Sequence, residues 1–206
     1  MSDQRSLSYD DVCGDMAPHL DGESYRVLTE YLKKTSVFLE FGAGGSTFLA
    51  LHTGVNEVHS VESDLVFLSS ISKRVYSLGL APKFHPHPID IGPTGEWGAP
   101  KSRDFASTWF LYPLKVWYEL IFSQSSPDLI LIDGRFRVSC FLASLVLAKK
   151  GATILFDDYY ERSYYHVVES FIKPSLRVGR LAVFEKTNRS SLSCLIYMLL
   201  HLGDFR

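Results

Sequence analysis

The feature that most constrains this chain is the alternation of short apolar runs with helix-length segments. Continuous runs rich in β-branched and aromatic residues occupy positions 37–41, 57–62, 83–91, 128–133 and 152–156, and most of them precede a segment with helical patterning. Strands buried on both faces have this character, and strand–helix alternation implies right-handed parallel crossovers. The pattern predicts an α/β, doubly wound fold.

The C-terminal part predicts antiparallel strands instead. Residues 180–186 and 192–200 form two further apolar runs that we interpret as a terminal hairpin. No stretch of about 18 apolar residues occurs, so no segment is expected to span a membrane. Residues 1–15 are charged and lack an apolar stretch, which argues against a signal peptide.

Composition narrows the class of partner. Lys and Arg total 21 and Asp and Glu total 23, a net charge of −2, so nucleic acid is not expected as a partner. A length of 206 residues with 46% hydrophobic residues indicates a single domain over residues 1–206. Cys13, Cys140 and Cys194 form no CxxC pair, and their odd number argues against a disulfide framework. We interpret them as reduced, buried thiols of a cytoplasmic protein.

Residues 92–126 interrupt the alternation. About 35 residues separate the third and fourth runs, where a short connection is expected. The segment leaves the carboxyl end of the third strand, at the edge where ligands of such folds bind. We interpret it as an inserted lid, in which Glu96 and Trp97 could close over a site. The alternative is a helix at 114–122 that buries an aromatic face, with Trp97 packed in the core.

A glycine-rich loop follows the first run. The sequence EFGAGGST occupies residues 40–47, where glycines let the backbone turn tightly and approach a ligand. Glu62 closes the second run 20 residues after Gly42, a position suited to binding ribose hydroxyls. Glu40 would repel a pyrophosphate, and Thr47 stands where a dinucleotide-binding loop has its third glycine. These departures favour the cationic S-adenosylmethionine over a nicotinamide dinucleotide.

The same residues resemble a known family. EFGAGGST is similar to the first motif of class I S-adenosylmethionine-dependent methyltransferases, and VESD at 61–64 resembles their second motif. The resemblance covers residues 35–200 and implies a Rossmann-like, mostly parallel, seven-stranded sheet. The alternative is a plain glycine turn beside a surface glutamate. The cofactor-binding residues that the resemblance and the loop indicate are Glu40, Gly42, Ala43, Gly44, Ser46, Thr47, Glu62, Ser63, Asp90, Ile91 and Asp133.

Three aspartates follow the fourth and fifth runs, namely Asp133, Asp157 and Asp158. Adjacent parallel strands lie about 4.8 Å apart, so these carboxylates converge and need a compensating cation, proton or arginine. Metal-dependent O-methyltransferases, including the macrolide- and coumarin-sugar enzymes, look similar here, which implies Mg²⁺ on the three aspartates and an activated acceptor hydroxyl. Arg135 and Arg137 depart from that pattern. An arginine–aspartate clamp for an anionic substrate and a structural ion-pair network therefore remain alternatives.

Three histidines are further candidates. His85 and His87 share one face of the third run, as metal ligands do, although Pro86 and Pro88 favour an exposed strand. His166 follows the fifth run, where a general base could lie, and a helix-surface residue is the alternative.

Together these features predict transfer of a methyl group from S-adenosylmethionine to a small-molecule acceptor, at a hydroxyl oxygen. Asp133, Arg135 and His166 are the candidate catalytic residues, and in-line displacement demands mainly alignment. Two alternatives stay open: a methyltransferase-like protein that binds the cofactor without catalysis, and a nicotinamide-dependent oxidoreductase. The apolar C-terminal run could pair as an edge strand between chains, so a homodimer is a further expectation.

Overall fold

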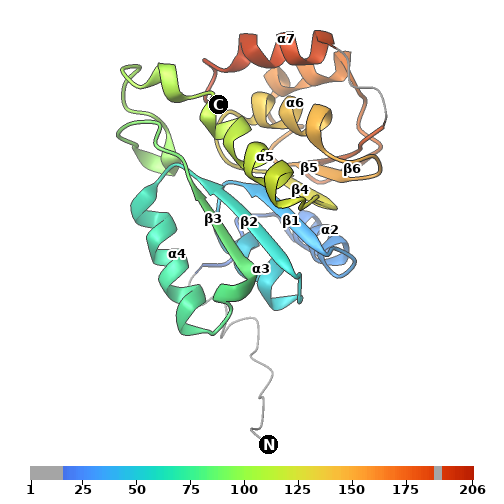
Figure 1. Ribbon diagram of the computed structural model, residues 1–206. Helices are drawn as coiled ribbons and strands as arrows, with labels where there is room; N and C mark the ends of the chain where they lie inside the picture. The colour runs from blue at the N-terminus through green and yellow to red at the C-terminus, as the bar shows by residue number, and fades with distance from the viewer. Residues whose placement is uncertain (1–15, 188–191) are drawn as a thin grey trace, which may run out of the picture.

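The computed structural model describes residues 16–187 and 192–206, and within them seven strands form one sheet. The strand order is β3-β2-β1-β4-β5-β7-β6 (Figure 1). The first five strands run parallel, and β7 lies antiparallel between β5 and β6. The prediction of a doubly wound, mostly parallel sheet with an antiparallel hairpin is confirmed. The strands are β1 Val37–Phe41, β2 Glu57–Glu62, β3 Phe84–Pro88, β4 Leu129–Ile132, β5 Thr153–Phe156, β6 Leu176–Val178 and β7 Leu181–Glu185.

Helices cover both faces of the sheet, each over its own apolar core. On one face lie α2 Gly22–Leu32, α3 Gly45–His52 and α4 Leu65–Ser77, whose buried side chains pack with Phe38 and Leu131. On the other lie α5 Leu111–Ser123, α6 Arg137–Leu147 and α7 Leu192–His201, packed with Ile130 and Phe156 (Figure 1). Four short 3₁₀ helices connect these elements: η1 Ala81–Lys83, η2 Glu96–Gly98, η3 Ala106–Thr108 and η4 Ser163–Ser170.

The last apolar run differs from the prediction. Residues 192–200, expected as a strand, lie in α7, and the hairpin consists of β6 and β7. Cys194 and Met198, four residues apart, are both buried against the α6 side of the core, which is the spacing of a helix face. The helix predicted near residues 165–172 is the 3₁₀ helix η4, and the third strand is confined to Phe84–Pro88 at the sheet edge.

The inserted segment 92–126 has two parts. Residues 92–110 form a loop with two 3₁₀ turns, and α5 follows. Tyr112, Val116, Trp117 and Leu120 of α5 are buried in the core, so the helix interpretation describes the second part. Trp97 in the first part is 72% exposed, so its side chain does not pack in the core.

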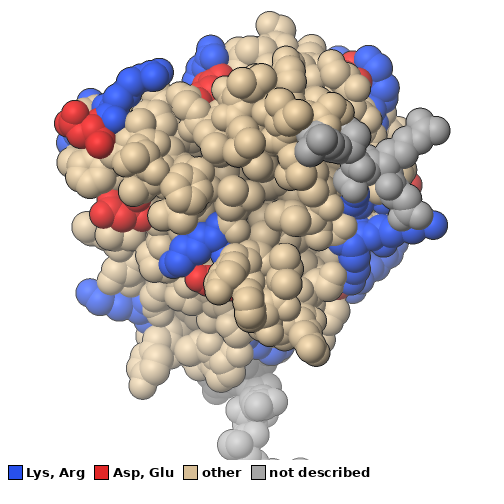
Figure 2. Space-filling model, turned by 45° about the horizontal axis from the view of Figure 1, so that its top comes forward, with Lys and Arg blue, Asp and Glu red and all other residues tan. Residues whose placement is uncertain are grey.

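The outer surface over α5 and α7 carries several exposed apolar side chains. Tyr118, Ile121 and Phe122 of α5 and Leu199 and Leu200 of α7 are exposed. The face in Figure 2 is largely uncharged, with Lys and Arg mostly around its margin. Dimerisation stays a prediction, and since α7 is a helix its route would not be strand pairing.

Three further sequence expectations concern the burial of the cysteines, the absence of a signal peptide and the absence of a membrane-spanning segment. Cys140 and Cys194 are buried, as expected, whereas Cys13 lies outside the described residues. The expectation that residues 1–15 are not a signal peptide also falls outside them. In the part of the chain that the structure describes, no helix is both long and apolar enough to cross a membrane.

Candidate functional site

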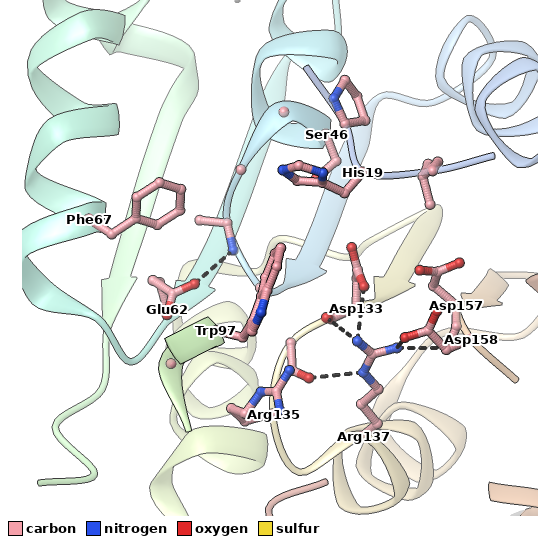
Figure 3. A pocket seen from close by; sticks show the side chains of 18 of the residues that line it. His19, Ser46, Glu62, Phe67, Trp97, Asp133, Arg135, Arg137, Asp157 and Asp158 are labelled. Atoms are coloured by element: carbon pink, nitrogen blue, oxygen red, sulfur yellow. Dashed lines mark hydrogen bonds and ion pairs between the residues drawn. The ribbon is translucent and has the colours of Figure 1, made fainter. Parts of the chain in front are cut away.

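A cavity of about 1310 Å³ opens at the carboxyl ends of the parallel strands. Its wall is formed by the loop after β1, the end of β2, the η2 turn, the segments after β4 and β5, and Arg180, which directly precedes β7. Figure 3 shows Trp97 between Glu62 and Asp133, with His19 above it. Among the described residues that line the cavity, eight are acidic and four are arginines, so the lining carries an acidic excess that favours a cationic ligand. They are Asp21, Glu62, Asp64, Glu96, Asp133, Asp157, Asp158 and Glu161, against Arg135, Arg137, Arg162 and Arg180.

Two glycines of the loop after β1 differ in what surrounds them. Gly42 has φ +99°, and a Cβ there would lie 2.7 Å from the backbone of Gly134, so the β1 and β4 loops meet where no side chain fits. A Cβ on Gly44 would have nothing within 4 Å, although Gly44 lines the cavity. The space in front of Gly44 is therefore open to a ligand.

Glu40 lies beneath this loop and does not line the cavity. It is fully buried, and the hydroxyls of Ser46, Thr47 and Ser60 donate hydrogen bonds to its carboxylate, that of Ser60 at 2.5 Å. Burial raises the pKa of Glu40 to about 7 despite these three donors. Glu40 thus ties the start of α3 to β2, and its influence on a ligand would act through the loop.

Glu62 ends β2 and faces the cavity. Its Oε2 accepts the Ala43 amide at 3.2 Å, and its Oε1 accepts the amides of Ser63 and Asp64 at 2.6 and 2.8 Å (Figure 3). Burial raises the pKa of Glu62. These amides fix the carboxylate in place and join the glycine loop to the end of β2.

The three aspartates converge as the sequence indicated, and Arg137 holds them from within the fold. Arg137 is 3% exposed. Its guanidinium donates to the carbonyls of Asp133, Gly134 and Asp157 at 2.8–2.9 Å and pairs with the carboxylates of Asp133 and Asp158 at 3.1 Å (Figure 3). A bidentate, planar donor suits this geometry better than a lysine would.

Two more arginines complete the network. Arg180 Nε and Nη2 bind the two oxygens of Asp157 at 2.9 and 2.7 Å, and Arg162 Nη2 binds Asp158 at 2.8 Å. Burial raises the pKa values of both Asp133 and Asp157, and the arginines oppose that shift. Each carboxylate is therefore occupied by a guanidinium, so the aspartates do not fit the open oxygen set that Mg²⁺ requires. This geometry matches the ion-pair alternative.

Arg135 has a different environment from Arg137. It lines the cavity, and its Nε is buried without a hydrogen-bond partner among the described residues. Burial, followed by the nearby Arg137, lowers the pKa of Arg135. Because Nε is inaccessible, only the rest of the Arg135 guanidinium could contact an anionic group of a ligand in the cavity.

Several candidates from the sequence lie apart from the cavity. His166 Nε2 contacts the Tyr159 carbonyl at 3.1 Å, and its ring packs on Tyr159, so it does not line the cavity. Asp90 accepts the Gly92 amide, and buried Ile91 accepts Trp109 Nε1. Ser63 is bound to Glu62. The candidates that the cavity brings together are Gly42, Ala43, Gly44, Ser46, Glu62, Asp133, Arg135, Asp157 and Asp158.

Sequence reasoning missed two parts of the wall. Residues 16–21 pass over the β1 loop, and Arg180, directly before β7, pairs with Asp157. A signal for Arg180 did exist: in an antiparallel pair the start of one strand lies beside the end of the other, so β7 begins where Asp157 follows β5. No pattern in residues 16–21 indicated their position.

A doubly wound sheet with a glycine loop after β1 and an acidic residue at the end of β2 has the architecture of a class I methyltransferase. The solved structure of a methyltransferase-like protein from Silicibacter pomeroyi is 32% identical, with a TM-score of 0.79, and the match covers 92% of this chain and 98% of that one. The chain therefore belongs to the methyltransferase-like proteins of the class I S-adenosylmethionine-dependent methyltransferase superfamily.

More distant structures share the fold. An O-methyltransferase from Bacillus cereus in complex with SAH is 14% identical, with a TM-score of 0.51 over 76% of this chain. The O-methyltransferase TomG from Streptomyces achromogenes, involved in tomaymycin synthesis and bound to SAM, is 16% identical, with a TM-score of 0.50 over 79% of this chain. The chain spans 64% of the length of each. Neither a protein-family model nor a curated protein sequence matches the chain.

Proposed function

We propose that the protein binds S-adenosylmethionine in the cavity and transfers its methyl group to a small-molecule acceptor, at an oxygen atom. The observation that carries the proposal is the open space in front of Gly44, enclosed on one side by Glu62 and on the other by the acidic end of β4 and β5. An acidic, glycine-cradled cavity fits a ligand that carries a sulfonium, an ammonium and a ribose but no phosphate.

In this proposal Glu62 and Trp97 bind and enclose the cofactor. Glu62, held by three backbone amides, accepts hydrogen bonds from the ribose hydroxyls. Trp97, whose ring lies edge-on to His19 at 5.6 Å, closes over the bound molecule and excludes water. The bound cofactor supplies an electrophilic methyl group.

The acceptor is positioned by the opposite wall. Arg135, whose side chain lines the cavity, binds an anionic group of the acceptor and so aligns the attacking oxygen. The Asp133 carboxylate, 29% exposed as a side chain and partly neutralised by Arg137, would take the hydroxyl proton. The acceptor oxygen would gain the methyl carbon as the carbon–sulfur bond of the cofactor breaks, and the demethylated thioether would be the leaving group. Proximity and alignment provide most of the rate enhancement, and no step uses a metal.

Calorimetric titration of the purified full-length protein with S-adenosylmethionine tests cofactor binding. We expect micromolar binding that Mg²⁺ does not alter, and no binding of NAD. The Gly44→Val variant places its Cβ in open space, with no heavy atom within 4 Å, so it should fold normally and lose binding at least about tenfold, equal to about 1.4 kcal/mol. Gly203→Val, which also has open space, is the control and should bind as the wild type does.

Tryptophan fluorescence gives an independent readout. Trp109 and Trp117 are buried, whereas Trp97 is 72% exposed at the cavity, so a change on cofactor addition should vanish in Trp97→Phe. Wild-type protein that binds neither the cofactor nor its demethylated product would contradict the proposal.

Binding without catalysis is the second candidate. The observation that favours it is the pairing of all three aspartates with arginines, which leaves little free basicity in the cavity. The Asp133→Asn variant distinguishes a catalytic protein from one that only binds the cofactor. Methyl transfer to hydroxylated acceptors should fall in this variant if Asp133 accepts a proton. A protein that binds the cofactor tightly but transfers no methyl group to any hydroxylated acceptor would favour the binding role.

A further inference from the structure

A second cluster of titratable side chains lies at the opposite end of the strands from the cavity. Glu57 and His59 of β2 and His85 of β3 place their nearest ligand atoms within 4.8 Å of one another. His59 and His85 stand opposite each other in the parallel register, and their rings stack at 4.6 Å. Glu57 and Glu62 are five residues apart on β2, about 16 Å at 3.3 Å per residue, so this cluster is separate from the cavity.

A chain of hydrogen bonds fixes which nitrogen of His59 carries its proton. The Glu119 carboxylate of α5 can only accept, so His87 Nδ1, 2.6 Å away, donates to it. In the neutral His87 ring, Nε2 then carries a lone pair and accepts from His59 Nδ1 at 3.0 Å. That leaves a lone pair on His59 Nε2, on the side of the ring that faces Glu57.

In this tautomer two hydrogen-bond acceptors, His59 Nε2 and Glu57 Oε2, face each other without a proton between them. His59 Nε2 lies 3.3 Å from Glu57 Oε2, and the Ser125 hydroxyl already donates to that oxygen at 2.6 Å. A lone pair facing a carboxylate is unfavourable unless a cation lies beside both groups.

We propose that Glu57, His59 and His85 bind a divalent transition-metal ion of the zinc type. Two imidazoles and one carboxylate form a donor set that suits Zn²⁺, with water in the fourth position. Small side-chain shifts bring the three donors to the usual metal–ligand distances of about 2.0–2.2 Å.

Glu119 and His87 are positioning residues in this site. A histidine that ligates a metal usually donates its other ring N–H to a fixed partner, which sets the tautomer and the ring orientation. Here the partner is His87, itself anchored by Glu119. The ion would link the edge strand β3, which Pro86 and Pro88 interrupt, to β2.

Zinc titration of the full-length protein tests the site. The protein is stripped with EDTA, exchanged into chelator-free buffer and titrated with Zn²⁺ against a chromophoric chelator. We expect one Zn²⁺ per chain, loss of affinity of at least about 100-fold in His59→Gln and Glu57→Gln, and weakening by about 10–100-fold in His87→Gln. His201→Gln on α7, whose ring contacts the Tyr197 carbonyl, is the control and should leave affinity unchanged.

Circular dichroism establishes that each variant folds. If His59→Gln does not fold, His85→Gln is used to remove a metal ligand instead. This substitution on the edge strand leaves the hydrogen bonds between His59, His87 and Glu119 in place. Wild-type protein that takes up no stoichiometric Zn²⁺, or that binds it no more tightly than His85→Gln does, would overturn the proposal. S-adenosylmethionine binding by the stripped protein is not expected to change, so this test is independent of the proposed function.

Discussion

Gly42 and Gly44, two residues apart, should respond to alanine in opposite ways. Gly42→Ala puts a methyl group 2.7 Å from the Gly134 backbone at φ +99°, and strain plus overpacking of this kind destabilise by about 2–4 kcal/mol. Gly44→Ala meets no protein atom and should change the free energy of unfolding by less than about 0.5 kcal/mol. Urea denaturation measures both values. Equal stability of the two variants would show that the β1 and β4 loops are not in close contact.

The buried Glu40 carboxyl should make stability depend on pH. Because its folded pKa of about 7 lies above the ordinary 4.5, the folded protein binds this proton more tightly than the unfolded chain does. The associated stabilisation is fully present below about pH 4.5 and is lost as pH rises through 7, and the 2.5-unit difference corresponds to about 3 kcal/mol.

Glu40→Gln isolates this contribution, since its amide does not titrate. We expect the stability of wild type relative to Glu40→Gln to fall by about 3 kcal/mol between pH 5 and pH 8.5. Denaturation curves of both proteins at several pH values supply the difference, and the shared contributions of the other groups cancel. A constant difference across that range would mean that Glu40 is ionised throughout.

At the scale of elements, the start of α6 joins the ends of β4 and β5. Arg137 is the first residue of this helix, and its guanidinium satisfies three carbonyls and two carboxylates. Arg137→Leu removes the cation but leaves the buried carboxylates, so we expect a loss of about 3–5 kcal/mol in thermal or urea unfolding. Arg103→Leu, on the exposed loop before η3, is a control for loss of one positive charge and should change stability little. A mild effect of Arg137→Leu would mean that the aspartates are protonated or hydrated instead.

The elements differ in how far the sequence could predict them. Apolar runs such as Leu129–Ile132 predicted the parallel strands, because a strand buried on both faces has no polar alternation. The run in α7 is equally apolar, and periodicity alone does not separate a buried strand from a buried helix. The residues of the glycine loop and Glu62 were predicted from spacing along the chain. The partners of the aspartates were not, because Arg162 and Arg180 reach them through tertiary contacts that leave no local pattern.

At the scale of the whole molecule, the cavity is closed by segments from opposite ends of the described chain. The Arg180 guanidinium donates to the His19 carbonyl and pairs with Asp157, and Asp21 caps α2 while accepting from the Arg180 amide at 3.5 Å. The segment 16–21 thus links the β6–β7 hairpin to the glycine loop. A Cβ on Gly45 would lie 2.1 Å from the Pro18 nitrogen, so this segment can rest on α3 only because residue 45 has no side chain.

Gly45→Ala should therefore open the cavity without unfolding the sheet. The added methyl group displaces the backbone at Ala17 and Pro18, whereas Gly45 itself starts a helix in a conformation that alanine adopts. Hydrogen exchange by mass spectrometry should show faster exchange in residues 16–21 and unchanged protection of β1 and β4. Because the same segment lines the cavity, affinity for S-adenosylmethionine should fall in parallel. Faster exchange in the segment with unaltered affinity would instead mean that residues 16–21 cover the cavity without contributing to ligand binding.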